Sequence, residues 1–149
     1  MNADLLQARE LLAAENLAFV LVQQGRVLAR GSDHGVVELL AAVDRLGPAV
    51  RGASLADKVV GKAVAMIVAF AGIGAVDTPL ASEAAEQVLR SRGIALHAAA
   101  LVPQILNRRG DGPCPLEQLT QPFTEPGAAL VKLREFFAAR TSAPPGARA

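Results

Sequence analysis

Apolar residues recur with two different periods along the chain, and these periods predict its helices and strands. Five segments have the period of an amphipathic helix: residues 4–14, 35–46, 54–71, 82–93 and 125–140. Four shorter apolar runs are typical of strands: residues 17–23, 26–31, 75–81 and 94–102. Gln24 and Gly25 separate the first two runs, which predicts a tight antiparallel hairpin. The last run is apolar enough to be a buried strand.

Capping residues indicate where two of the predicted helices begin. Ser54 and Asp57 have the spacing of a capping box, so the helix over residues 54–71 is expected to begin at SLAD. Ser82 is expected to cap a second helix, which Gly93 closes.

The order of these elements predicts the fold class. Strands that alternate with helices favour parallel pairing, with helices on both faces of the sheet. We therefore expect a three-layer α/β/α sandwich with a mixed sheet, in which the N-terminal hairpin supplies an antiparallel pair. Residues 103–122 have no periodic pattern, and a loop of that length is usually functional or disordered, although its apolar residues indicate packing. Residues 1–140 are expected to form a single domain, followed by a disordered tail over residues 141–149.

Composition and charge narrow the classes of partner. The formal net charge is +1 without a block of like charges, and Trp and Tyr are absent, so nucleic acid is not an expected partner. The longest apolar run, residues 63–76, is too short to span a membrane, and the N-terminal residues lack the pattern of a secretion signal. The single cysteine, Cys114, cannot form an internal disulfide. A reducing compartment fits that count, and a cytoplasmic location is expected.

Three long strings carry a resemblance to known proteins: GASLADKVVGKAVA (residues 52–65), SEAAEQVLRSRGI (residues 82–94) and VPQILNRRGDGPCPLE (residues 102–117). Together they resemble a small prokaryotic family of uncharacterised proteins whose fold is cytidine-deaminase-like. The predicted elements also resemble the deaminase core of helix, hairpin, helix, strand, helix and strand, with the helix over residues 35–46 as an addition.

The resemblance raises the question of zinc. In zinc deaminases the metal lies between two helix N-termini, with ligands from an H-x-E and a P-C-x-x-C motif. The resemblance implies that these helix starts are SLADK and ASEAAE here, and neither contains a His or Cys. Because zinc catalysis needs three protein ligands and one open position, no metal and no cofactor are expected. His34 is expected in a turn and His97 in the core.

Polar residues at these helix starts are the first candidates for a binding site. Lys58 and Lys62 are four residues apart and would share a helical face, close to Asp57. They either extend to water from a half-buried helix or add charge to an anion site at its N-terminus. Ser82 and Glu83 either face the same cleft or serve only as the cap and an acidic first-turn residue.

The loop supplies a second group of candidates. Cys114 precedes a short helical turn that contains Glu117, and it is either an activated nucleophile or a small buried apolar residue. Asn107 and Arg108 either form and flank the Gly-Asp-Gly turn or bind a carboxylate or phosphate.

Three functions are compatible with these residues. The first is a zinc-free deaminase-like domain that binds a small anionic or nucleotide-like metabolite in the cleft formed by two helix N-termini. The second is a non-zinc enzyme that uses Cys114 as nucleophile in acyl or sulfur transfer, with Lys58 or Glu117 assisting proton transfer. The third is an interaction module without catalysis that forms a homodimer through its sheet edge or an outer helix.

Overall fold

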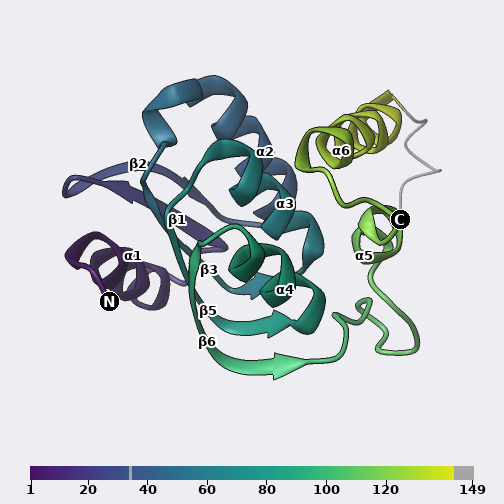
Figure 1. The fold of residues 1–149 in the computed structure, drawn as a ribbon, viewed down its shortest axis with the longest axis horizontal. Coiled ribbons are helices and arrows are strands. Elements are labelled where there is room, and N and C mark those ends of the chain that lie inside the picture. Colours follow the sequence, from purple (N-terminus) through teal and green to yellow (C-terminus); the bar gives the residue numbers. More distant parts are fainter. Residues whose placement is uncertain (34, 143–149) are drawn as a thin grey trace.

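The computed structural model describes residues 1–33 and 35–142. In chain order its elements are α1 (Ala3–Ala14), β1 (Phe19–Gln23), β2 (Arg26–Gly31), α2 (Gly35–Leu46), the 3₁₀ helix η1 (Gly47–Val50), β3 (Ser54–Asp57), β4 (Val59–Val60), α3 (Lys62–Ala71), β5 (Ala75–Ser82), α4 (Glu83–Ser91), β6 (Ala95–Val102), α5 (Pro115–Thr120) and α6 (Pro126–Ser142). Figure 1 shows α1 on one face of the sheet, α2 to α4 on the other, and α5 and α6 beyond α3. The predicted α/β/α sandwich is confirmed.

The sheet is mixed, as expected. Strands β2, β1, β3 and β5 lie side by side in that order, and β6 pairs with the other edge of β5. Strand β1 is antiparallel to both β2 and β3, whereas β3, β4 and β6 all run parallel to β5. Within the described residues, β6 is therefore the last strand on its side of the sheet.

The N-terminal hairpin forms at the predicted turn. Gln24 and Gly25 both have positive φ angles, 50° and 78°, as a two-residue turn of type I′ requires. The Asp4 carboxylate of α1 accepts hydrogen bonds from the N–H groups of Gln24 (2.7 Å) and Gly25 (2.8 Å). Helix α1 therefore fixes the turn as well as covering the sheet.

The apolar core lies on both sides of the sheet. Between α1 and the sheet it consists of Ala8, Leu12, Val20, Val22 and Ala56. The larger part fills the space between the sheet and α2, α3 and α4 and continues to α6, which packs against α3. Its largest members include Phe19, Leu21, Leu39, Leu55, Ile67, Leu89, Leu130 and Leu133.

Residues 54–60 form strands β3 and β4, so the prediction that a helix begins at SLAD is wrong. Strand β3 pairs with β1 on one edge and β5 on the other, and all four of its residues are buried. Pairing on both edges outweighs the local capping signal, because strand formation depends mainly on tertiary context. The Ser54 hydroxyl donates a hydrogen bond to the Asn2 side chain (3.1 Å), and helix α3 begins only at Lys62.

The presence of β3 changes how α2 fits the element order of the deaminase fold. The order of helix, hairpin, helix, strand, helix and strand is now met by α1, β1 with β2, α2, β3, α3 and β5. Helix α2, which was expected to be an addition, is therefore the helix between the hairpin and the third strand.

Strand β6 was predicted to be buried, and most of its side chains are exposed. Helix α1 contacts β1, β3 and β5 but does not extend over β6. The exposed side chains are Ala95, His97, Ala99, Ala100 and Leu101. The prediction that His97 is a core residue is therefore also wrong.

The segment after β6 packs on the domain in part, as expected. Leu116 and Leu119 of α5 contact the larger core, whereas Leu106 is 49% exposed. Helix α6 continues to Ser142, so it includes the first two residues of the predicted tail. The rest of that tail, residues 143–149, and the turn predicted at His34 lie outside the described residues. In the part of the chain that the structure describes, no helix has the length and apolar character to cross a bilayer.

Candidate functional site

The N-terminus of α3 is capped by a side chain from a distant part of the chain. Gly61, the N-cap residue, has no side chain to offer the helix. Glu117 of α5 supplies the cap, because its Oε1 accepts a hydrogen bond from the Lys62 N–H at 2.8 Å. A Cβ atom on Gly61 would overlap this oxygen and stand 2.9 Å from the Glu117 carboxyl carbon. Glycine at position 61 is thus what allows the carboxylate to approach the helix.

Glu117 also links α3 to α4. Ser82 caps α4, since its Oγ accepts a hydrogen bond from the Ala85 N–H at 3.1 Å, as predicted. Burial raises the pKa of the Glu117 carboxyl, whereas the Lys62 N–H, the Lys62 ammonium and the Ser82 hydroxyl lower it in part. The starts of α3 and α4 therefore meet at one carboxyl group.

A small pocket of about 230 Å³ opens beside this carboxyl group. We call it the Glu117 pocket, and it is lined by Ser82, Ala84, Pro103, Gln104, Pro113, Glu117, Gln118 and Gln121. Its polar groups are one carboxyl, one hydroxyl and three primary amides, and its lining contains no lysine or arginine. Such a lining offers hydrogen-bond donors and acceptors without a strong positive charge.

The two lysines do not share a helical face, because residues 58–61 precede α3. The Lys62 Nζ donates a hydrogen bond to the Gln121 carbonyl oxygen (2.8 Å), just past the end of α5. The Lys58 Nζ donates to the Asn16 Oδ1 (2.6 Å), next to α1. An anion site formed by both lysines on one helix is therefore not present.

Asp57 ends strand β3 in a buried position, apart from the Glu117 pocket lining. Its Oδ1 accepts a hydrogen bond from the Val59 N–H (3.1 Å), and its Oδ2 has no partner. Burial raises the pKa of this carboxyl to about 8, against an ordinary value of 3.8. Asp57 is therefore mainly uncharged at neutral pH.

The other predicted site residues lie outside the lining of the Glu117 pocket. Cys114 is the half-buried N-cap of α5, and neither a cysteine nor a histidine lines the Glu117 pocket. Asn107 holds the Gly-Asp-Gly turn, because its Oδ1 accepts from the Gly110 N–H (2.8 Å) and its Nδ2 donates to the Asp111 Oδ1 (2.9 Å). Arg108 and Glu83 are exposed.

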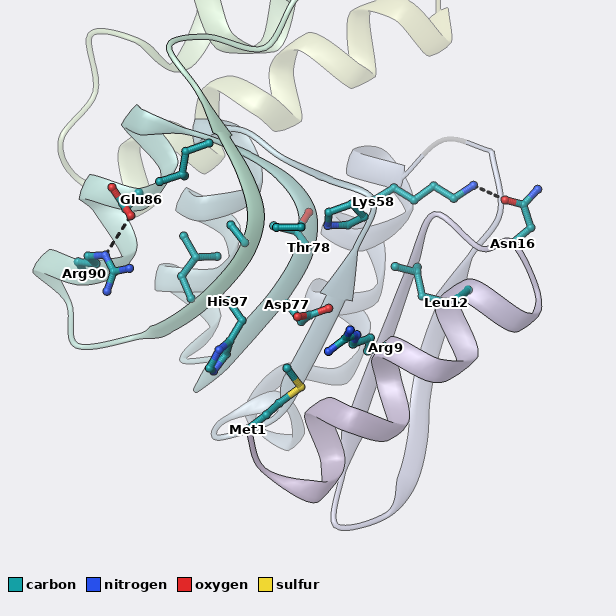
Figure 2. Close-up of a pocket in the computed structure, with 16 residues that line it drawn as sticks. Met1, Arg9, Leu12, Asn16, Lys58, Asp77, Thr78, Glu86, Arg90 and His97 are labelled. Atoms are coloured by element: carbon teal, nitrogen blue, oxygen red, sulfur yellow. Dashed lines mark hydrogen bonds and ion pairs between the residues drawn. The ribbon is translucent and has the colours of Figure 1, made fainter.

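A larger hollow, of about 710 Å³, follows strand β6 and was not predicted from the sequence. Figure 2 shows Arg9, Asp77 and His97 at one side of β6, with the Glu86–Arg90 ion pair of α4 at the other. Asp77 and His97 are neighbours across the β5–β6 pair. Burial raises the pKa of Asp77, and the nearby Arg9 guanidinium opposes that shift. Only the alternation of side chains along β5 and β6 could have placed Asp77 and His97 on one face.

Comparison with protein families identifies the chain. A family profile described as TM1506, a domain of unknown function (DUF1893), matches residues 7–137. The chain belongs to this family. The crystal structure of the DUF1893 family protein TM1506 from Thermotoga maritima has a TM-score of 0.84 and 21% sequence identity, over 92% of each chain. The DUF1893 fold therefore extends over nearly the whole chain.

Other solved structures, a deaminase among them, match this DUF1893 protein more loosely. The dCMP deaminase from the cyanophage S-TIM5, in complex with dCMP and dUMP, has a TM-score of 0.48 and 15% identity over 66% of this chain and 98% of that one. NE0047 in complex with 2,6-diaminopurine has a TM-score of 0.49 and 15% identity over 97% and 85%. No curated protein sequence matches the chain. The family predicted from the three strings is confirmed, and deaminases are among the structural neighbours of the chain.

The described residues of this DUF1893 chain, which do not include His34 before α2, offer no set of ligands for the zinc site of a deaminase. Among the described residues, no three His, Cys, Asp or Glu side chains are grouped so that they could hold a metal ion. At the start of α3, the Glu117 carboxylate already accepts the Lys62 N–H. A zinc deaminase needs three protein ligands there and a free coordination position.

Proposed function

We propose that this DUF1893 chain is a binding domain, without zinc chemistry, for a small anionic or nucleotide-like metabolite in the Glu117 pocket. The observation that carries the proposal is the position of the Glu117 carboxyl, which sits where the starts of α3 and α4 meet and also lines the pocket. Half-buried carboxyl groups with a raised pKa, located beside a pocket, are typical of functional sites.

The lining favours the nucleotide-like ligand over a simple anion. Glutamine amides present a donor and an acceptor side by side, and carboxylates accept hydrogen bonds from amino groups; proteins use both to recognise the edges of nucleobases. Three such residues line the pocket in addition to Glu117: Gln104, Gln121 and Gln118, whose Nε2 already donates a hydrogen bond to the Pro113 carbonyl oxygen (3.1 Å). Its volume, about 230 Å³, is below the usual range for drug-sized ligands and suits a single heterocycle.

A phosphate group is less well suited to the interior of the pocket. The Lys62 N–H, which an anion at the helix N-terminus would need, is already bonded to Glu117. A phosphorylated ligand is therefore expected to place its phosphate outside the pocket.

We expect the domain to act in a reducing, cytoplasmic setting, which the single cysteine supports.

Ligand screening with two matched variants tests this proposal. Nucleobases, nucleosides, nucleoside monophosphates and inorganic phosphate are titrated against the wild type, Glu117→Gln and Glu83→Gln, with thermal shift followed by calorimetry. We expect a base-containing ligand to bind the wild type and Glu83→Gln equally, and Glu117→Gln at least about tenfold more weakly, which corresponds to about 1.4 kcal/mol.

The two variants separate the pocket from the rest of the α4 start. Glutamine at position 117 keeps an oxygen for the Lys62 N–H, so the cap is retained while the carboxylate is lost. Glu83 is an exposed first-turn residue outside the pocket lining. The proposal fails if no base-containing ligand binds the wild type, or if Glu117→Gln binds as tightly as the wild type.

A further inference from the structure

Strand β6 has an open outer edge over its whole length. It pairs with β5 from Ala95 to Val102, and no hydrogen bond to the opposite edge occurs within the described residues. Figure 1 shows no other element along that side of the strand. An edge of this kind presents a row of backbone N–H and C=O groups that can pair with another strand.

The strand lacks the features that usually protect an edge. Its sequence, ALHAAALV, contains no proline, lysine, arginine or acidic residue, and seven of its eight residues, all but Ala99, pair with β5. Proteins normally block such edges with charges, prolines or bulges, because an unprotected edge associates with other strands. Leu101 is also 46% exposed, which adds an apolar side chain to the same strand.

Charges on both sides of β6 are balanced rather than of one sign. The hollow along the strand contains Arg9, Lys58 and Arg90 as cations, and Asp77 and Glu86 as anions. A strongly basic or acidic partner is therefore not favoured. The surface around β6 is compatible with a partner surface that carries the same mixture of charges. A second copy of this chain has such a surface.

The side chains of β6 are self-complementary in an antiparallel pair. With a two-fold axis through Ala99, Ala98 lies opposite the partner's Ala100, and His97 lies opposite the partner's Leu101. No like charges meet, the small alanines allow close approach, and each imidazole covers the other copy's exposed leucine. We propose that two copies of this chain form a homodimer by pairing their β6 strands edge to edge, with Ala99 at the centre.

Charge substitutions at the centre of the pair test the proposal. Glutamate at position 99 would place two carboxylates opposite each other in the dimer, whereas Ala99 is exposed in the monomer. We expect the wild type to sediment as a dimer. For Ala99→Glu and Ala99→Lys, we expect the dimer dissociation constant at low salt to rise by at least roughly tenfold. A mixture of the two variants is expected to restore dimers, because unlike charges then face each other.

A control variant and amide hydrogen exchange complete the test of the β6 dimer. Ala41→Glu introduces the same side chain at an exposed position of α2, and we expect this variant to dimerise like the wild type. Amide hydrogen exchange of residues 96–102 is expected to slow with increasing protein concentration in the wild type but not in Ala99→Glu. A wild type that remains monomeric, or an Ala99→Glu variant that dimerises as strongly as the wild type, would overturn the proposal.

Discussion

Asp57 has one carboxylate oxygen bonded to the Val59 N–H and another that has no partner. A buried carboxyl without a counter-charge is costly when ionised, and this cost raises its pKa to about 8. Between about pH 4 and pH 8, the folded state therefore binds a proton that the unfolded state has lost. Under these conditions the free energy of unfolding falls as the pH rises, and above pH 8 this contribution to the slope ends.

Replacement of Asp57 by asparagine is expected to remove this slope. The wild type should lose about 1 kcal/mol of stability per pH unit between pH 5 and pH 7, because one proton is taken up on folding. Asp57→Asn, which cannot ionise, should be the more stable protein at pH 7 and close to the wild type at pH 4. Urea unfolding across this pH range measures the effect, and Asp33→Asn controls for the loss of an exposed carboxylate. Parallel pH profiles for wild type and Asp57→Asn would contradict the assignment.

The contact between Gly61 and Glu117 also depends on the identity of single residues. The carboxylate reaches the Lys62 N–H only because position 61 has no Cβ. The φ angle of Gly61 is −94°, which any residue can adopt, so backbone conformation does not require glycine here. The requirement comes from the neighbouring side chain.

A double-mutant cycle should show this coupling. Gly61→Ala is expected to displace Glu117 and cost about 1 kcal/mol, the usual cost of a lost helix cap. In a Glu117→Ala background, the same change should cost clearly less, since the carboxylate is already gone. Gly127→Ala in α6, where an added Cβ meets nothing within 4 Å, is the control for a glycine substitution in a helix. Additive costs in denaturant unfolding would rule out the proposed contact.

At the scale of elements, α6 is held to the domain by apolar packing more than by its ion pair. Leu130 and Leu133 are fully buried against the larger core. Arg134 donates hydrogen bonds to Asp44 of α2 (2.8 Å and 3.2 Å), but the two side chains remain 40% and 44% exposed. Exposed ion pairs contribute little, because water screens the charges.

Leu133→Ala should therefore destabilise the protein much more than Asp44→Ala. We expect roughly 2–5 kcal/mol for the leucine, from lost burial and the cavity left behind. For the aspartate we expect less than about 1 kcal/mol. Unfolding in urea measures both, with Val131→Ala as a control for an exposed side chain of the same helix. An effect of Asp44→Ala as large as that of Leu133→Ala would show that the ion pair holds the helix.

At the scale of the whole molecule, the features that sequence patterns predicted are those decided by neighbours in the chain. The turn at Gln24 and Gly25 and the Ser82 cap are such local features. Strand β3 was missed because its capping signal is local, whereas its two pairing strands are distant in sequence. Burial of β6 was misjudged because composition records that a strand is apolar, but not whether a helix covers it.

The candidate site shows the same division. Ser82 and Glu117 were among the predicted residues, and both line one pocket. The contact between Glu117 and Gly61 was not predictable, because the two residues are far apart in the sequence: α3, β5, α4 and β6 lie between them. The prediction that Lys58 and Lys62 share a helical face was wrong because it assumed that residues 58–61 are helical.

The contact between Gly61 and Glu117 also bears on how sequences in this family can diverge. A side chain at position 61 is incompatible with the present contact between the Glu117 carboxylate and the Lys62 N–H. Relatives that replace the glycine are expected to carry a shorter residue at position 117. Residue choice at these two positions is therefore linked, and a chimera that takes α3 from one relative and α5 from another should be more stable when the two come as a matched pair.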